Sequence, residues 1–135
     1  MKIFVTGGAG FIGSAFVRYV LKLTSDSIIN FDKLSYAGNL SSLEPVKDLK
    51  KYSFIHGDIC NYDQLKAAIF SSKPDCIIHF AAETHVDRSI HGDCHEFVMT
   101  NTYGVLMLLN ICKNYDINKI REQYISLYNS ILSKV

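Results

Sequence analysis

Residues 4–16 read FVTGGAGFIGSAF, an apolar stretch followed by closely spaced glycines and then by further apolar residues. The residues before the glycines predict a short buried strand, and those from Phe11 to Leu23 recur at helical spacing. The glycines at 8, 10 and 13 form the pattern G-x-G-x-x-G, and those at 7, 10 and 13 form G-x-x-G-x-x-G. Glycine permits a tight turn and lets the backbone approach a pyrophosphate. The stretch therefore predicts a strand–turn–helix unit whose helix N-terminus favours phosphate groups.

The rest of the chain continues the alternation of strands and helices. Further strands are expected at 27–31, 52–56 and 75–82, a polar loop follows the second strand, and helices are expected at 62–72 and 96–115. The strand over 75–82 is apolar on both faces, as a central parallel strand requires. The pattern predicts an α/β fold of the Rossmann type, a doubly wound parallel sheet with strand order 3-2-1-4. The residues expected to carry the helical periodicity or to face inward are Ile12, Phe16, Val20 and Leu23 in the first helix and Phe97, Val98, Val105, Leu108, Leu109 and Cys112 in the last.

One carboxylate strengthens the glycine pattern. Asp32 ends the second predicted strand, 19 residues after Gly13. A carboxylate at this spacing accepts hydrogen bonds from the adenosine ribose of a dinucleotide, and its charge repels a 2′-phosphate. The spacing therefore favours NAD over NADP, although Lys33 supplies a neighbouring cation that could soften the repulsion. The alternative is a plain strand–turn–helix junction with a surface aspartate.

Composition excludes several classes of function. A formal net charge of +1 in 135 residues provides no basic surface for nucleic acid, and no apolar window has the length of a membrane span. The N-terminus lacks the apolar stretch of a signal peptide, and the four cysteines form no C-x-x-C pair. These features predict free thiols and a cytoplasmic location. No metal site is expected either, because the histidines at 79, 85, 91 and 95 and Cys94 lack zinc-ligand spacing.

Five stretches of the sequence, VTGGAGFIGS, DKLSYAGNL, GDIC, HFAAETHVDRSI and TNTYGVLMLL, resemble the extended short-chain dehydrogenase/reductases. Within that family, DKLSYAGNL and AAETHVDRSI are similar to the sugar-nucleotide lyases that dehydrate dTDP-glucose. The resemblance covers residues 1 to about 118 nearly in register. It departs after Ile90, where the chain reads HGDCHEFVMTN and the family usually has Gly-Pro and one residue fewer before its Thr-Asn. We therefore expect the start of the last helix to be displaced.

The resemblance implies NAD as the cofactor and dTDP-glucose as the substrate. It places the pyrophosphate at the backbone of Phe11 and Ile12, the ribose among residues 32–35, the adenine beside Asp58 and Ile59, and the nicotinamide side along residues 80–84. The full set that it assigns to the cofactor is Gly7, Gly10, Phe11, Ile12, Gly13, Asp32, Lys33, Leu34, Ser35, Asp58, Ile59, Phe80, Ala81, Ala82, Glu83, Thr84 and Thr100, with Thr84 also reaching the substrate sugar.

Each assignment has a purely structural alternative. Phe11 and Ile12 could be core residues at a helix start, Asp58 could cap the turn before Cys60, and Thr84 could bond its own backbone. His79 is expected to be a hydrogen-bonded strand residue rather than a ligand.

The family's chemistry is an internal oxidation and reduction with loss of water between the two. It depends on a tyrosine base with a lysine four residues on, and on a Thr-Asp-Glu segment that ends a fifth strand. The sequence contains no Thr-Asp-Glu segment. Tyr115 and Lys119 match the Tyr-x-x-x-Lys pattern but fall one strand and one helix too early, so we interpret this match as coincidental.

These observations predict a truncated unit without a C-terminal substrate domain. Residues 1–120 are expected to form an NAD-binding Rossmann half, and 121–135 a divergent helical tail that covers the free edge of the fourth strand unless a second chain does so. Two hypotheses follow: the cofactor-binding portion of an NAD-dependent sugar-nucleotide dehydratase that is inactive alone, or a non-catalytic dinucleotide-binding fragment. A sugar-nucleotide epimerase of the same superfamily is the alternative enzyme, and a homo-oligomer is the expected protein partner.

Overall fold

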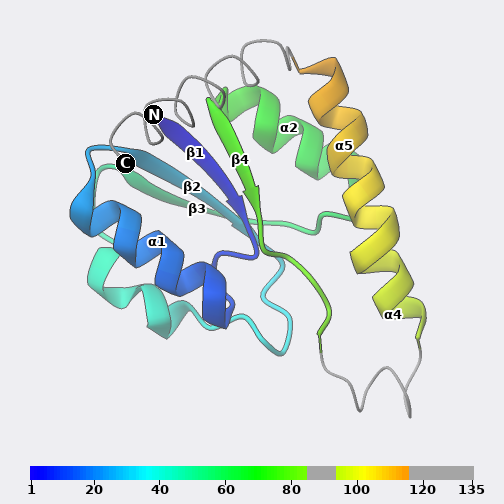
Figure 1. The fold of residues 1–135 in the computed structure, drawn as a ribbon, viewed down its shortest axis with the longest axis horizontal. Coiled ribbons are helices and arrows are strands. Elements are labelled where there is room, and N and C mark those ends of the chain that lie inside the picture. The colour runs from blue at the N-terminus through cyan, green and yellow to red at the C-terminus, as the bar shows by residue number, and fades with distance from the viewer. Residues whose placement is uncertain (85–93, 116–135) are drawn as a thin grey trace, which may run out of the picture.

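The computed structural model describes residues 1–84 and 94–115, and in them strands and helices alternate as expected (Figure 1). The strands are β1 (Lys2–Thr6), β2 (Ser27–Asp32), β3 (Tyr52–His56) and β4 (Cys76–His79). The helical elements are α1 (Phe11–Leu23), the 3₁₀ helix η1 (Leu40–Val46), α2 (Tyr62–Ser72), α4 (His95–Val98), the π-helical turn η2 (Met99–Gly104) and α5 (Val105–Asn114).

The four strands form one parallel sheet in the order β3-β2-β1-β4, which confirms the expected topology. The register pairs Thr6 of β1 with Phe31 of β2 and with His79 of β4. All strands therefore end at one edge of the sheet, and the loops that follow β1, β2 and β3 meet there. In an open parallel sheet this carboxyl edge is where ligands bind, at the point where the strand order reverses between β1 and β4.

Helices cover both faces of the sheet (Figure 1). Alternate residues of β1 point to opposite sides, so Ile3 and Val5 pack with Val17 of α1 and Leu43 of η1, while Phe4 packs on the other face. That second cluster joins the sheet to α2 and α5 through Phe31, Leu65, Ile69, Leu108 and Ile111. Both faces are thus apolar, which explains why the strands read as nearly continuous apolar runs.

Two local expectations were wrong. The fourth strand ends at His79 and not at Ala82. The polar loop after β2 is present as expected, and it leads into the 3₁₀ helix η1, which the sequence analysis did not anticipate. In α1, Ile12 and Leu23 are exposed, and the buried face consists of Gly13, Ser14, Val17, Val20 and Leu21. The small residues Gly13 and Ser14 face inward because the first turn of α1 packs directly against the glycine loop.

The last helical stretch begins at His95, within one residue of the expected position, but it is not one regular α-helix. Its middle part, Met99–Gly104, is a π-helical turn, which accommodates one residue more than an α-helical turn. The expected inward residues Val98 and Leu109 are exposed, whereas Thr100, Gly104, Leu108 and Ile111 are buried. The sequence analysis did not anticipate this π turn, although Leu108 was expected to face inward and does so.

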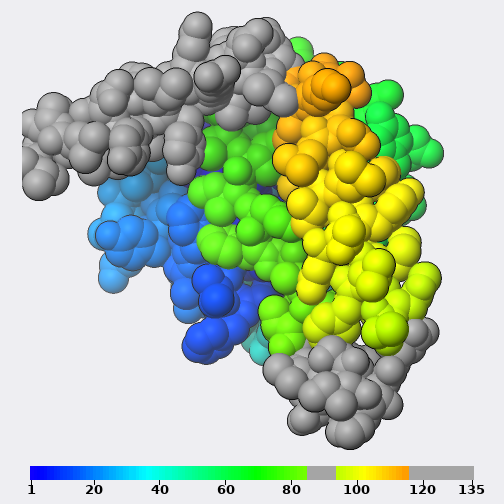
Figure 2. All heavy atoms as spheres, turned by 45° about the vertical axis from the view of Figure 1, so that its right-hand side comes forward, coloured from blue at the N-terminus to red at the C-terminus, as the bar shows by residue number. Residues whose placement is uncertain are grey.

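In the space-filling view, the stretch 94–115 lies beside the segment that contains β4, and this segment reaches the surface between α1 and α5 (Figure 2). Strand β4 is an edge strand of the described sheet. The residues expected to cover this edge, 121–135, and the whole predicted tail lie outside the described residues.

Candidate cofactor-binding site

The loop between β1 and α1 turns sharply at the carboxyl edge of the sheet. Gly7 has a φ of +70°, and a Cβ there would lie 2.6 Å from Cα of Ala81. At Gly13 a Cβ would overlap the carbonyl oxygen of Gly7. Backbone bonds from Gly7 N to Phe31 O (3.0 Å) and from Gly10 N to Gly7 O (3.2 Å) hold the turn. Only glycine fits these two positions, because one needs a left-handed backbone and the other leaves no room for a side chain.

The turn places the N-terminus of α1 at this edge, and no side chain caps that N-terminus. Gly10 is the N-cap residue, no side chain accepts from the first turn, and that turn contains no acidic residue. Phe11 and Ile12 are 93% and 67% exposed. The alternative that they are core residues is therefore wrong. The free N–H groups and the positive end of the helix dipole remain available to an anion.

Asp32 ends β2 directly beside this turn and is 8% exposed. Its Oδ2 accepts a hydrogen bond from Ala9 N, and its Oδ1 accepts one from Leu34 N, both at 2.8 Å. Each carboxylate oxygen has a second acceptor position, so the group can still accept from ribose hydroxyls. Asp32 thus joins the glycine turn to the loop after β2, a structural role that the sequence did not suggest.

A cleft opens between these loops. Most of the residues that the sequence assigned to a cofactor line it: Gly7, Gly10, Asp32, Lys33, Ser35, Asp58, Ile59, Phe80, Ala81, Ala82, Glu83 and Thr100. Four lining residues were missed, namely Phe31, Ala37, Gly38 and Gly57. The structure thus brings the predicted set together around one space, and the individual contacts to a cofactor remain predictions.

The remaining assigned residues lie outside this lining. Phe11 and Ile12 are at the exposed start of α1, and Gly13 is buried beneath the turn. Leu34 belongs to the loop after β2, where its φ is +54°. Thr84 is exposed and directly precedes the undescribed residues 85–93.

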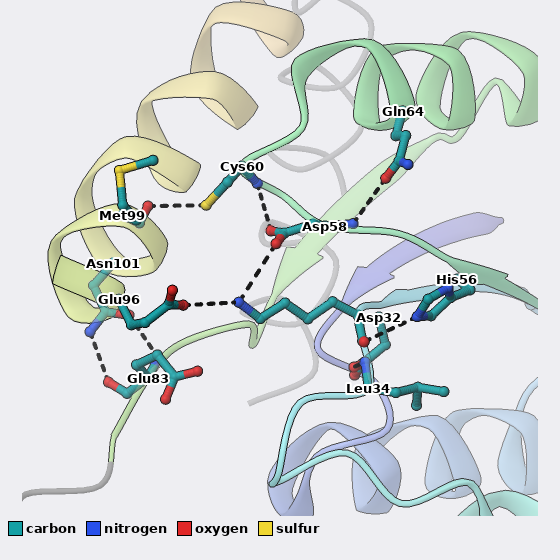
Figure 3. Close-up of polar contacts among 11 residues, drawn as sticks. Asp32, Leu34, His56, Asp58, Cys60, Gln64, Glu83, Glu96, Met99 and Asn101 are labelled. Carbon is teal, nitrogen blue, oxygen red and sulfur yellow. Dashed lines mark hydrogen bonds and ion pairs between the residues drawn. The ribbon is translucent and has the colours of Figure 1, made fainter. Parts of the chain in front are cut away.

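Charged groups face one another on one side of the cleft (Figure 3). Nζ of Lys33 lies 3.6 Å from Oδ2 of Asp58 and 3.7 Å from Oε2 of Glu96. Burial alone would lower the pKa of Lys33, but the negative charges of Asp58, Glu96 and Glu83 outweigh it and raise that pKa. Asp58 also accepts from Cys60 N at 2.9 Å, so its alternative role as a cap of that turn is confirmed.

Another part of the cleft depends on η2. The side-chain amide of Asn101 forms two hydrogen bonds of 2.8 Å with the backbone of Glu83, accepting from its N–H and donating to its carbonyl. Thr100 is 4% exposed, and its Oγ1 has no hydrogen-bond partner among the described residues. Asn101 is a positioning residue that the sequence analysis missed, although it belongs to the same Thr-Asn pair as Thr100.

The described residues contain no group of three or more histidine, cysteine or acidic side chains that could hold a metal ion. Oγ1 of Thr6 and Nδ1 of His79 are hydrogen-bonded at 2.6 Å, as expected for a strand histidine. Burial and the neighbouring Asp58 raise the pKa of the Cys60 thiol to about 11, so it is not an activated nucleophile. No helix within the described ranges is long and apolar enough to cross a membrane.

Neither match to Tyr-x-x-x-Lys supplies a base to the cleft. Tyr115 donates from its hydroxyl to Pro74 O at 3.4 Å, at the amino end of β4, and burial and Asp75 raise its pKa. Lys119 lies outside the described residues. A second match, which the sequence analysis missed, is Tyr62 with Lys66 on α2, where Nζ lies over the ring at 5.7 Å from its centroid.

Comparison with known proteins agrees with the fold. The dTDP-glucose 4,6-dehydratase of Shigella flexneri is 51% identical over 115 residues, which are 85% of this chain and 32% of that protein. The chain thus spans about a third of the length of the curated relatives it matches. The crystal structure of DesIV, a dTDP-glucose 4,6-dehydratase from Streptomyces venezuelae with NAD bound, matches with a TM-score of 0.79 and 42% identity, over 85% of this chain and 36% of that one.

An epimerase has nearly the same fold. The UDP-Glc/GlcNAc 4-epimerase of Campylobacter jejuni matches with a TM-score of 0.78 and 32% identity, over 87% of this chain and 35% of that one.

The resemblance to dTDP-glucose 4,6-dehydratases is confirmed by the identity of about half of the residues compared. A model of the family described as GDP-mannose 4,6 dehydratase matches residues 4–129. The chain belongs to the GDP-mannose 4,6-dehydratase family.

Proposed function

We propose that the chain binds NAD in the cleft at the carboxyl edge of the sheet, as the cofactor-binding portion of a dTDP-glucose 4,6-dehydratase. The observation that carries the proposal is the position of Asp32. Its carboxylate is buried, touches the glycine turn through Ala9 N and retains free acceptor positions. A dinucleotide whose pyrophosphate lies at the α1 N-terminus would bring its adenosine ribose to this carboxylate.

The groups left open around the cleft fit such a ligand. The first turn of α1 has uncapped N–H groups for the pyrophosphate, and Gly7 lets the backbone pass close to Ala81. Thr100 supplies a buried hydroxyl that lacks a partner in the described part of the chain. A buried hydroxyl without a hydrogen bond costs stability, so its retention beside the cleft supports a role toward a ligand.

Bound NAD would accept a hydride from the sugar and return it later in the reaction. The described residues would bind and orient the cofactor: Asp32 the ribose, Asp58 and Ile59 the adenine, and 80–84 the nicotinamide side. The negative charge of Asp32 disfavours a 2′-phosphate at the same place. We also propose that the protein acts in the cytoplasm, which its dispersed cysteines favour.

Calorimetric titration of the 135-residue chain with NAD and NADP tests the proposal. We expect binding of NAD with a clear preference over NADP, and a loss of about 1–3 kcal/mol of NAD binding in Asp32→Ala. Asp48→Ala, which removes an exposed aspartate, is the matched control and should bind like the wild type. Equal affinity of the wild type for the two cofactors would contradict the proposal.

We further propose that these 135 residues do not turn over a sugar nucleotide by themselves. Positioned acid and base groups each contribute about 10²–10⁴-fold to a rate, and neither Tyr-x-x-x-Lys match places a tyrosine hydroxyl beside a lysine in the cleft. Incubation with dTDP-glucose and NAD⁺ should therefore yield no 4-keto-6-deoxy product. Product above background that is abolished by Tyr115→Phe or Tyr62→Phe would contradict this.

A non-catalytic dinucleotide-binding fragment would behave identically in the binding experiment and in this assay. The alternative of an epimerase is disfavoured by the lower identity to the epimerase structure, 32% against 42% for DesIV. The two enzyme classes share the cofactor, so the binding experiment holds for both.

A further inference from the structure

The ammonium group of Lys33, the residue next to Asp32, is held by carboxylates from two other parts of the chain. Its Nζ lies 3.6 Å from Oδ2 of Asp58 and 3.7 Å from Oε2 of Glu96. Figure 3 shows Glu96 well apart from Asp32. Both distances are those of ion pairs without a hydrogen bond, so the ammonium group is restrained mainly by charge.

A basic side chain at this place in the sequence has a specific consequence in dinucleotide-binding folds. Enzymes that use NADP place a cation near the end of the second strand, where it pairs with the 2′-phosphate. Lys33 is long enough and close enough in sequence to serve in that way if its ammonium group were released. The preference for NAD over NADP that Asp32 creates therefore depends on the position of the Lys33 ammonium group.

The two partners of Lys33 differ in what else they do. Asp58 belongs to the loop after β3, caps Cys60 N and is expected to contact the adenine. Glu96 lies on α4, does not line the cleft, and its side chain is 64% exposed. Removing the charge of Glu96 therefore disturbs the position of Lys33 without removing a group that the cofactor is expected to touch.

We propose that Glu96 is a specificity-determining residue that favours NAD over NADP by drawing the ammonium group of Lys33 toward α4, away from the ribose of the cofactor. The inference rests on the proposed function, since it concerns the same cleft and cofactor. Glu96 acts through Lys33 and not through the cofactor itself. Its effect must therefore vanish when Lys33 is replaced.

The effect is modest because the pair is partly exposed. Lys33 and Glu96 have side chains that are 28% and 64% exposed, and such pairs are screened by water and salt. Exposed ion pairs contribute about 0.2–1 kcal/mol, which corresponds to a change in relative affinity of about 1.4-fold to fivefold. We expect the ratio of the dissociation constants for NADP and NAD to fall about threefold in Glu96→Gln.

The experiment is a calorimetric titration of the full chain with NAD and with NADP, at one low ionic strength, in the wild type and five variants. The variants are Glu96→Gln, Lys33→Gln, the Lys33→Gln/Glu96→Gln double variant, Asp32→Ala and Glu44→Gln. The last is the matched control: Glu44 pairs with Lys47 at 2.7 Å on η1, with both side chains more than half exposed, and does not line the cleft. Thermal unfolding of each variant establishes that it is folded.

The inference is supported if Glu96→Gln lowers the ratio through tighter NADP binding, while Glu44→Gln does not and Glu96→Gln has no further effect in the Lys33→Gln background. If Glu96→Gln binds NAD but leaves the ratio of the dissociation constants for NADP and NAD unchanged, the inference is overturned. An equal decrease in both backgrounds also overturns it, because the loss of negative charge would then act without Lys33. Failure of the wild type to bind NAD overturns the proposed function and this inference with it.

Discussion

Helices α1 and α2 begin at the same edge of the same sheet, and their first turns are built in opposite ways. At the start of α2, the side chain of Asn61 accepts from Gln64 N at 3.1 Å, and Asp63 adds a negative charge to the first turn. At the start of α1, Gly10 provides no side chain and no acid follows. The N–H groups at the N-terminus of α2 are capped by a side chain of this chain, whereas those at the N-terminus of α1 are left for another molecule to bind.

Two buried threonines repeat the contrast. Thr6 in β1 is fully buried, and its hydroxyl is bonded to His79. Thr100 beside the cleft is nearly as buried, but its hydroxyl has no partner within residues 1–84 and 94–115. Of these two hydroxyls, the one in the sheet is bonded within the chain and the one beside the cleft is not; Oδ1 of Asn30 in β2 is also buried without a partner among the described residues. The following experiments test whether this division is real.

Gly7→Ala should have the largest effect. The substitution places a Cβ on a residue with a φ of +70° and brings it 2.6 Å from Cα of Ala81. We expect a loss of about 3 kcal/mol of unfolding free energy, from backbone strain and overpacking together, with loss of NAD binding. Urea denaturation measures the loss of unfolding free energy. Gly10→Ala is the control, because a Cβ at residue 10 would contact only the carbonyl oxygen of Gly7, at 3.3 Å. Equal losses in the two variants would contradict the turn geometry.

The threonine pair should give the next largest difference. Thr6→Val leaves the ring of His79 without its bonded partner and should cost about 1–2 kcal/mol of unfolding free energy. Thr100→Val removes a hydroxyl without a described partner and should leave stability unchanged or slightly raised, while NAD binding weakens. Thermal unfolding and calorimetry on both variants separate the two outcomes. A stability loss in Thr100→Val as large as that in Thr6→Val would show that the hydroxyl of Thr100 is satisfied.

Asn61→Ala should destabilise the chain by about 1 kcal/mol, the usual value for a lost N-cap. Affinity for NAD should stay unchanged, because Asn61 closes α2 and does not line the cleft. Asn61→Asp retains the cap and is the control. A loss of NAD affinity in Asn61→Ala as large as that expected for Asp32→Ala would contradict the distinction between the N-termini of α1 and α2.

The smallest expected effect concerns pH. Burial lowers the pKa of His79 below its ordinary value of 6.5, so the unfolded chain takes up a proton more readily than the folded one. The contribution to stability is full above about pH 6.5 and decreases as the pH falls below it, through the folded pKa. His79→Gln should flatten the decline in unfolding free energy between pH 7.5 and 5.5. An unchanged slope in His79→Gln would contradict this assignment.

The sheet and much of the cleft could be predicted from the sequence because they depend on backbone geometry. The glycine spacing and Asp32 define a strand, a turn and a second strand, and parallel topology brings their ends together. Phe31, Ala37, Gly38 and Gly57 were missed, since they line the cleft with main-chain and apolar atoms that carry no chemical signal.

The faces of the helices were harder to predict. Periodicity identifies a helix but not its rotation about its own axis, which packing decides. In α1 the loop draws Gly13 and Ser14 inward and leaves Ile12 exposed. In the last stretch the buried residues are Thr100, Gly104, Leu108 and Ile111, and the regular spacing assumed from the sequence does not allow for the π turn at Met99–Gly104.

The π turn between α4 and α5 also determines how this wall of the cleft tolerates changes in length. Removing one residue from a regular α-helix rotates everything on one side of the deletion by about 100°. A π-helical turn can instead lose one residue and become an α-helical turn. Glu96 before it and Leu108 after it then keep their orientation about the helix axis. Met99–Gly104 is therefore the place where this wall can gain or lose a residue during evolution without losing its alignment.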